Sequence, residues 1–459
     1  MKEMGFGDAV LQGLASDRGL MVPTHIPTFP EGAPEKWRDL SFQELAYEVM
    51  SLYVPESEIP AADLKNIINK SYSTFRSPDI TPVVNLDDKL SVLELFHGPT
   101  FAFKDVALQF LGNLFEYLLA QRGIELMTVI GATSGDTGSS AIHGLRGKKG
   151  VQCFILYPDG RTSPIQEKQM TTVLDENIHN IALQGNFDDA QNIVKALFAD
   201  LPFKKEYNLG AVNSINWARI LAQTVYYVYA YLRTSKNGEP VSFSVPTGNF
   251  GDILAGFYAK KMGLPVDDLV VATNENDILD RFFKSGSYSR NECLETITPS
   301  MDITISSNFE RFLYHMAGDD SAALSGMMSE FESTGTLTGT PDLVAACRAQ
   351  MKSAMVPDDE VLKTIGDYEK ANGYVLDPHS AIGVAAANKV GTDAKKMISL
   401  ACAHWGKFPM AVERAVGSEA MSKLDPPQQL AELDSMDSRK HIVNAEIEDV
   451  RTFIVDQLA

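Results

Sequence analysis

Short apolar runs alternate with longer amphipathic stretches along most of this chain. Buried strands are typically short apolar runs bounded by Gly, Pro or polar residues, and this pattern predicts strands at 91–95, 126–130, 151–157, 178–183, 241–246 and 397–401. Helical periodicity predicts helices over 106–118, 188–198, 217–232 and 253–262. This alternation predicts an α/β fold with doubly wound, mostly parallel sheets.

The pattern divides the chain into three parts. An N-terminal accessory segment is expected over 1–85, with helices at 42–53 and 61–72 and with Pro78 and Pro82 near its end. An α/β lobe is expected over 86–210, and a larger α/β lobe over 211–459 that finishes in a charged C-terminal helix. Within the larger lobe, residues 315–370 read as helical, with polar breaks at 318–320 and 336–340.

Composition narrows the class of protein. The chain has 459 residues, 44% of them hydrophobic, and a formal net charge of -20. An acidic chain is a poor partner for nucleic acid or anionic membranes, so neither is expected. No apolar run is long enough to span a bilayer. The cysteines and histidines show no metal-ligand spacing, so no metal site is expected.

One lysine stands where a strand gives way to a helix. Lys104 lies in the motif Phe96–Asp105, among Pro99, Phe101 and Phe103. An amine in apolar surroundings loses solvation of its charged form, so its pKa falls and it becomes a usable nucleophile. This suits a lysine that forms a Schiff base. The alternative is a surface lysine that merely opens a helix.

Two glycine-rich turns join a predicted strand to a predicted helix. They are Gly131–Gly138 and Thr247–Asp252. Each can present backbone N–H groups to an anion at a helix N-terminus, although α/β proteins also use such turns structurally. Neither has the Walker or the dinucleotide-binding spacing. With Lys104, the two turns indicate a phosphorylated cofactor at one turn and an anionic substrate at the other.

Further motifs identify a family resemblance that runs from about residue 8 to about residue 415. Besides the segments above, the matching motifs are residues 9–17, Asn213–Arg219, Gly248–Asp252, Ala272–Asp277, Ser306–Arg311 and Leu376–His379. The chain resembles the threonine synthases, pyridoxal-phosphate enzymes with the fold type of the tryptophan synthase β-subunit, and is most similar to their longer, fungal-like branch. The resemblance implies that pyridoxal 5'-phosphate is the cofactor and lies between two lobes.

The resemblance also implies residue roles. Lys104 would bind the cofactor covalently and later shuttle protons. The cofactor phosphate would be held by Gly248, Asn249, Phe250, Gly251 and Asp252. The substrate carboxylate would be received by Ser134, Gly135, Asp136 and Thr137, although Ser134 or Asp136 could instead cap the helix. The substrate phosphate would be bound by Asn213, Ser214, Asn216 and Arg219, with Arg311 as a further candidate.

One position departs from the family pattern. Cys402 stands where the family has a threonine that contacts the pyridine nitrogen of the cofactor, and Trp405 replaces the usual proline. A thiol is a weaker hydrogen-bond partner than a hydroxyl, so the tuning of the cofactor is expected to differ. The alternative is that Cys402 is simply a small buried residue after a strand.

The reaction implied by the resemblance converts O-phospho-L-homoserine and water to L-threonine and phosphate, by γ-elimination and addition of water at Cβ. A related phospholyase that releases 2-oxobutyrate is one alternative, and a cofactor-binding protein without turnover is another. The protein is expected to be a monomer or homodimer with a small-molecule substrate. A cytoplasmic location is expected, or an organelle if a transit segment precedes the chain.

Overall fold

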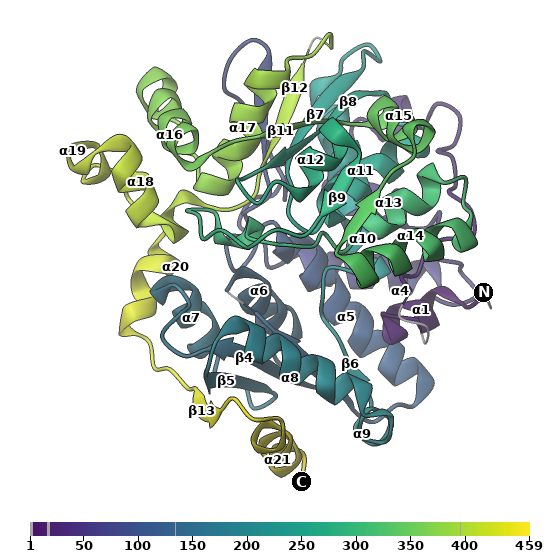
Figure 1. The fold of residues 1–459 in the computed structure, drawn as a ribbon, viewed down its shortest axis with the longest axis vertical. Coiled ribbons are helices and arrows are strands. Elements are labelled where there is room, and N and C mark those ends of the chain that lie inside the picture. The colour runs from purple at the N-terminus through teal and green to yellow at the C-terminus, as the bar shows by residue number, and fades with distance from the viewer. Residues whose placement is uncertain (1–2, 16–18, 134, 395) are drawn as a thin grey trace.

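The computed structural model describes residues 3–15, 19–133, 135–394 and 396–459. They form two lobes, each built on its own sheet (Figure 1). The larger lobe has a six-stranded sheet in the order β1 (Val83–Asn85), β2 (Leu90–Glu94), β12 (Met397–Ala401), β7 (Val241–Pro246), β8 (Val266–Thr273) and β11 (Lys352–Met355). Only β1 runs antiparallel to its neighbour, so the predicted mostly parallel sheet is confirmed.

Both faces of the larger sheet are buried, as expected for a doubly wound fold. Along β8, Leu269 and Val271 belong to a core shared with α10 (Trp217–Thr234) and α11 (Gly251–Lys261). Val270 and Ala272 alternate with them and pack in a second core against α16 (Asp358–Asn372) and α17 (Pro378–Val390). Side chains on successive strand residues point to opposite faces, so one strand serves both cores.

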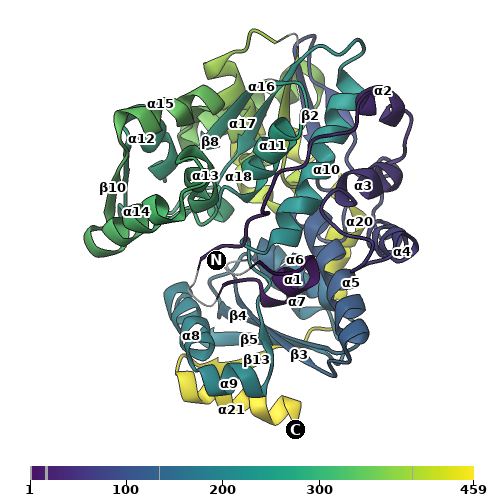
Figure 2. The ribbon, with the colours of Figure 1, turned by 90° about the vertical axis from the view of Figure 1, so that its right-hand side faces the viewer.

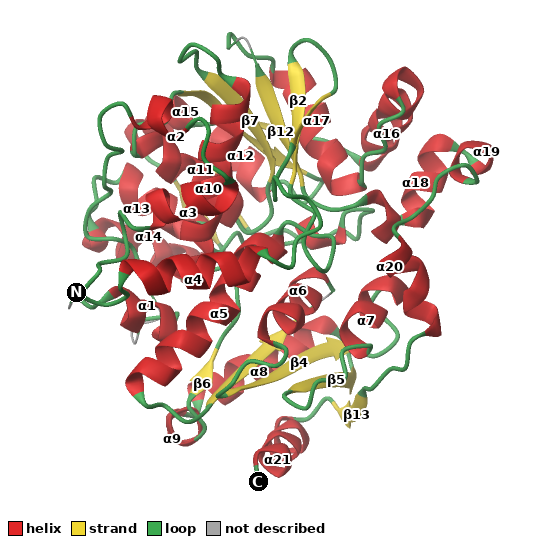
Figure 3. Ribbon diagram, turned by 180° about the vertical axis from the view of Figure 1, so that it is seen from behind, coloured by secondary structure: helices red, strands yellow, loops and turns green. Residues whose placement is uncertain are grey.

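The smaller lobe repeats this construction with an entirely parallel sheet (Figure 3). Its order is β13 (His441–Asn444), β5 (Ile178–Gln184), β4 (Val151–Pro158), β3 (Met127–Ala132) and β6 (Leu209–Gly210). One face packs on α5 (Lys104–Arg122), α6 (Asp136–Leu145) and α7 (Pro164–Thr171). The other face packs on α8 (Phe187–Ala199) and α21 (Ile447–Leu458).

Two strands cross the boundaries expected from the sequence. β2 lies within 86–210 but pairs with β12 in the larger lobe. β13 lies within 211–459 but pairs with β5, so the C-terminus returns to the smaller lobe (Figure 2). The apolar pattern of β2 indicates that it is buried but not which sheet it joins. β13 was not predicted as a strand, since its residues alternate between half-buried and exposed and form no apolar run.

Residues 315–370 are not entirely helical. β10 (Thr336–Thr338) pairs with β9 (Ser287–Ser289), and β11 closes one edge of the larger sheet. These strands are too short to show a clear alternation of apolar and polar residues. The helices of this region and of the lobe edges are α9 (Leu201–Glu206), α12 (Ile278–Ser285), α13 (Phe309–Met316), α14 (Ser321–Thr334), α15 (Pro341–Gln350), α18 (Pro409–Val416), α19 (Ser418–Met421) and α20 (Gln428–Ala431).

The N-terminal segment packs against α5 and α10, whose first turns carry the predicted site residues Lys104 and Arg219. Its helices are α1 (Phe6–Gln12), α2 (Ala33–Trp37), α3 (Phe42–Met50) and α4 (Ala61–Tyr72). α3 contacts α10 and α4 contacts α5. Ser41 and Glu44 form a capping box that starts α3 at its expected position. No helix of the described ranges is both long and apolar enough to cross a membrane.

Two glycines bring α5 and α6 into direct backbone contact. A Cβ on Gly144 would lie 2.4 Å from the Leu108 carbonyl oxygen, and a Cβ on Gly112 would lie 1.9 Å from the Gly144 carbonyl oxygen. No side chain can occupy that space without moving one helix. The contact therefore fixes the position of α5, which begins at Lys104, relative to α6, which begins at Asp136.

Gly144→Ala is expected to lower the free energy of unfolding by about 1–3 kcal/mol, because overpacking forces the helices apart. Thermal unfolding followed by circular dichroism measures the effect. Gly326→Ala is the matched control, since Gly326 lies on the exposed face of α14 with no atom within 4 Å of an added Cβ. Alanine favours a helix over glycine, so the control is expected to keep or raise the Tm. A Gly144→Ala protein as stable as the control would contradict this close packing.

Candidate active site

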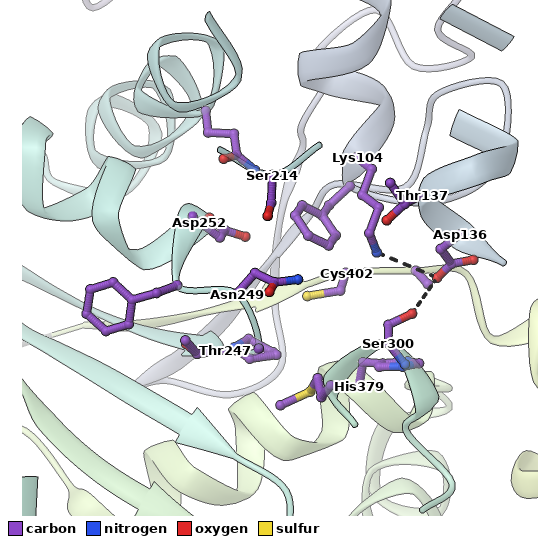
Figure 4. Close-up of a pocket in the computed structure, with 18 of the residues that line it drawn as sticks. Lys104, Asp136, Thr137, Ser214, Thr247, Asn249, Asp252, Ser300, His379 and Cys402 are labelled. Atoms are coloured by element: carbon purple, nitrogen blue, oxygen red, sulfur yellow. Dashed lines mark hydrogen bonds and ion pairs between the residues drawn. The ribbon is translucent and has the colours of Figure 1, made fainter. Parts of the chain in front are cut away.

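A cavity lies between the two lobes, and both glycine-rich turns reach it (Figure 4). Residues from α5 and α6 meet residues from α10, the β7–α11 turn and the segment after β12. The predicted site residues that line it are Lys104, Asp136, Thr137, Ser214, Arg219, Gly248, Asn249, Phe250, Gly251, Asp252 and Cys402. Ligands of doubly wound folds bind in such a place, at the carboxyl ends of the strands.

Lys104 is the first residue of α5 and is buried, with 9% of its surface exposed. Its Nζ faces the cavity, 3.9 Å from Asp136 Oδ2 and 4.6 Å from the centre of the Phe103 ring. Phe103 N–H donates to the Cys402 carbonyl oxygen at 2.7 Å, which ties this turn to the end of β12. Burial lowers the pKa of Lys104, and the nearby charge of Asp136 opposes this shift. This placement does not fit the alternative of a surface lysine.

The β7–α11 turn is closely packed. Phe250 adopts a left-handed backbone conformation with a φ of 62°, and its ring packs against Phe309 and Phe312. A Cβ on Gly248 would lie 3.3 Å from the Ser300 carbonyl oxygen, and one on Gly251 would lie 3.3 Å from Asn308 Nδ2. Asn308 Nδ2 also donates to the Asn249 carbonyl oxygen at 3.0 Å. The turn therefore presents the N-terminus of α11 to the cavity, as an anion site requires.

The side chain of Asp252 is held by two tyrosines of α10. Its Oδ1 accepts hydrogen bonds from the hydroxyls of Tyr226 and Tyr227. Its Oδ2 has no hydrogen-bond partner within the described residues. Burial raises the pKa of Asp252 to about 6, although the tyrosine hydrogen bonds oppose the shift. A carboxylate repels phosphate, so only the backbone of Asp252 suits the predicted phosphate cradle.

Arg219 is a buried cation on the first turn of α10. Its Nε and Nη1 have no hydrogen-bond partner in the part of the chain that the structure describes. Burial lowers its pKa to about 10, so the guanidinium stays charged at neutral pH. A buried charge without a partner is costly unless a ligand supplies the opposite charge. Arg219 therefore fits the predicted binding of an anionic group.

The other predicted anion turn, before α6, is capped from within. Ser134 lies outside the described residues. Thr133 Oγ1 accepts from the N–H groups of Gly135, at 3.0 Å, and Gly138, at 2.8 Å. The Asp136 side chain does not cap the helix but accepts from Lys407 Nζ, Gln166 Nε2 and Ser300 Oγ. Thr137 lines the cavity beside it.

Of the residues expected to contact the substrate, two are bonded to protein groups and a third lies outside the cavity. Asn216 caps α10 by accepting from Ala218 N–H at 3.0 Å, and its Nδ2 donates to the Val10 carbonyl oxygen. Asn213 is exposed and does not line the cavity, whereas Ser214 does. Arg311 is buried and donates to the carbonyl oxygens of Met21 and Ile215 and to the Asn308 side chain. Their side chains are engaged by protein groups or lie away from the cavity, so Asn213, Asn216 and Arg311 do not fit the predicted binding roles.

Cys402 follows β12 and lines the cavity. Its Sγ lies 3.8 Å from the Leu400 carbonyl oxygen, and its N–H donates to Ser380 Oγ at 2.8 Å. Burial, reinforced by the charge of Asp252, raises the pKa of the Cys402 thiol well above its usual value, so it is neutral. A neutral thiol in this position suits the predicted contact with a neutral ring nitrogen, which stays a prediction.

Several polar residues of the site were not selected from the sequence. Gln166, Gln223, Ser300, His379 and Lys407 line the cavity or bond to its residues. His379 Nε2 accepts from Ser300 N–H at 3.3 Å, and its Nδ1 lies 3.0 Å from Asp377 Oδ1. His379 belongs to a motif that matches the family, which was the available signal. Among the described residues, no group of His, Cys, Asp and Glu is placed to hold a metal ion.

Comparisons with known proteins agree with this geometry. The family model for pyridoxal-phosphate dependent enzymes matches residues 75–339. The model of the threonine synthase N terminus matches residues 1–72, and that of the threonine synthase C-terminal region matches residues 380–454. The fold and site thus define a pyridoxal-phosphate-dependent enzyme.

Individual relatives are similar over almost the whole chain. A threonine synthase of Schizosaccharomyces pombe is 51% identical over 90% of this chain and 87% of its own length. The structure of a threonine synthase from yeast has a TM-score of 0.95 at 46% identity, covering 100% of this chain and 96% of the other. A PLP-bound threonine synthase from Brucella melitensis has a TM-score of 0.95 at 44% identity, with 99% and 97% covered. The chain belongs to the threonine synthase family.

Proposed function

We propose that this protein converts O-phospho-L-homoserine and water to L-threonine and phosphate. The observation that carries the proposal is the buried amine of Lys104, which shares one cavity with the β7–α11 turn and with Arg219, whose Nε and Nη1 have no hydrogen-bond partner among the described residues. Lys104 is the nucleophile, and the β7–α11 turn and Arg219 are two separate positions for anionic groups. A substrate with its own phosphate, added to a cofactor with another, needs both positions.

The proposed reaction breaks the Cγ–O bond of the substrate and releases phosphate. The substrate loses protons at Cα and Cβ, regains protons at Cγ and Cα, and takes the hydroxyl group of water at Cβ. When bound, pyridoxal phosphate supplies the electron sink that stabilises negative charge on the substrate carbon atoms. The task of the chain is to hold the groups in place and to move the protons.

The chain's residues divide these tasks. The backbone N–H groups of Gly248–Asp252, at the N-terminus of α11, would hold the cofactor phosphate. Arg219 would bind the substrate phosphate through paired N–H donors, with Ser214 beside it. The first turn of α6, with Thr137, would receive the substrate carboxylate. Lys104, whose pKa is lowered by burial, would take the protons from Cα and Cβ and deliver protons to Cγ and Cα.

Product analysis tests the proposal. The purified protein with added pyridoxal phosphate is expected to form threonine and phosphate from O-phospho-L-homoserine in equal amounts. Formation of 2-oxobutyrate in place of threonine would assign the phospholyase activity instead. No product at all, with the cofactor bound, would identify a binding protein without turnover.

We also propose a cytoplasmic location and a monomeric or homodimeric state. The four cysteines are free thiols, which is typical of a reducing compartment. Cell fractionation and analytical ultracentrifugation test the two statements, and a larger assembly would contradict the second.

Cys402→Thr is expected to retain cofactor binding while changing the absorption of the bound cofactor and the ratio of threonine to 2-oxobutyrate. A hydroxyl is a stronger hydrogen-bond partner than a thiol, so it alters the electron demand of the ring it contacts. Absorption spectra and product ratios measure the change. Cys347→Thr, which alters a buried cysteine on α15 outside the cavity, is the control. If both variants keep the wild-type spectrum and ratio, Cys402 does not contact the ring.

A further inference from the structure

Lys407 is a fully buried lysine that the proposed reaction does not use. It lies in the short 3-10 helix Trp405–Lys407, after β12, and its side chain is 0% exposed. Its Nζ donates to Asp136 Oδ1 at 2.5 Å. Within the described ranges, its Nζ makes no other hydrogen bond. A charge buried so completely is costly unless its partner is well placed.

Asp136, the partner of Lys407, accepts further hydrogen bonds from residues of both lobes. Asp136 Oδ1 also accepts from Gln166 Nε2 at 2.8 Å. Oδ2 accepts from Ser300 Oγ at 3.2 Å (Figure 4). Oδ2 is the atom that lies 3.9 Å from Lys104 Nζ. One carboxylate thus stands between two lysines, and it is fixed by groups from both lobes.

This arrangement bears on the charge of Lys104. An amine must be neutral to attack a carbonyl group, whereas a carboxylate close to it favours the ammonium form. Lys407 places a positive charge on the far side of the same carboxylate and offsets its effect. The charged or titratable groups that act on Lys104 are Asp136, Lys407, Arg219, Asp252 and Cys402. His379, on α17, lines the same cavity and acts on the Asp136 carboxylate.

We propose that Lys407 is a positioning residue that acts through Asp136, holding its carboxylate in place and neutralising it so that Lys104 is left as a free amine facing the cavity. The inference deepens the proposed function, since it rests on Lys104 as the nucleophile of that reaction. The competing explanation is that the buried ion pair only joins the two lobes. Burial lowers the pKa of Lys104, Asp136 raises it and Lys407 lowers it, which agrees with the geometry.

The test measures the protonation of Lys104 directly and needs no turnover. The cofactor-free, full-length protein is labelled with a trace of acetic anhydride between about pH 6 and pH 11, and acetylation of Lys104 is quantified by mass spectrometry. The exposed Lys236 serves as the internal standard. Lys407→Met is expected to raise the pH midpoint of Lys104 labelling by about one unit or more. Lys407→Arg keeps the charge and is expected to stay close to the wild type.

A midpoint in Lys407→Met equal to that of the wild type would overturn the proposal and leave a purely structural ion pair. Lys440→Met is the control, because Lys440 pairs with Asp159 and Glu167 at the surface, and it is expected to change nothing.

A second variant keeps the test decisive if Lys407→Met does not fold. Asp136→Asn removes the carboxylate and leaves Lys407, so it is expected to lower the labelling midpoint of Lys104 below that of the wild type. The double variant Asp136→Asn/Lys407→Met is expected to lie above Asp136→Asn. An unchanged midpoint in Asp136→Asn would overturn the proposal. These results do not depend on which product the enzyme forms, so failure of the proposed function would be seen separately.

Discussion

Lys104→Ala is expected to abolish covalent attachment of the cofactor and to reduce turnover by at least ~10³-fold. Lys104 is the buried lysine whose Nζ faces the cavity, and the variant removes both the nucleophile and the group that moves protons. Borohydride reduction in the presence of pyridoxal phosphate, followed by peptide mass spectrometry, is expected to locate the cofactor on residue 104 in the wild type and to find no such adduct in the variant.

Lys363→Ala is the control for this experiment, since the Lys363 side chain is 72% exposed on α16 and pairs with Asp367 on the same helix. It is expected to keep the adduct and the activity. Normal turnover in Lys104→Ala would contradict the whole assignment of the site.

Arg219→Met is expected to lower kcat/KM for the phosphorylated substrate by roughly 30- to 5,000-fold, because truncating one partner of a buried charge pair typically costs about 2–5 kcal/mol. The effect on folding is expected to have the opposite sign. Two guanidinium nitrogens of Arg219 have no partner within the described chain, so methionine removes an uncompensated buried charge and keeps the apolar volume. Steady-state kinetics and thermal unfolding of the cofactor-free protein measure the two effects.

Arg311→Met provides the matched comparison. Arg311 is buried to a similar extent, but its guanidinium is bonded to Met21, Asn308 and Ile215. This variant is expected to lower the Tm, because the carbonyl groups of the N-terminal segment and of residue 215 lose their donor. If Arg219→Met lowers the Tm as much and leaves kcat/KM unchanged, Arg219 is a structural residue.

The secondary structure was largely predictable because most elements carry strong local signals. The strands at 241–246 and 397–401 are apolar runs bounded by polar or Gly-rich segments, and α10 shows helical periodicity across its length. Sheet membership was not predictable for β2 and β13. β2 lies between β1 and β12, and β13 lies at the edge beside β5, so each is placed by residues far away in the sequence that no local pattern records.

Some residues of the site could also be predicted from the sequence, and others could not. Lys104 and the β7–α11 turn could be found because each combines a distinctive residue with a strand-to-helix junction. The cap at Asn216 could not be predicted, because an asparagine before a helix suits a cap as well as a ligand, and only the structure shows that its oxygen accepts from Ala218 N–H. Lys407 was missed because its partner Asp136 lies 271 residues away in the sequence.

The most direct test of the central claim is the reaction of the purified protein with O-phospho-L-homoserine in water enriched in ¹⁸O. The proposed chemistry breaks the bond between Cγ and oxygen and adds water at Cβ. It therefore predicts threonine with ¹⁸O in its hydroxyl group and phosphate that contains no ¹⁸O from the solvent. Incorporation of ¹⁸O into the released phosphate, with homoserine as the other product, would show hydrolysis at phosphorus and would contradict the account.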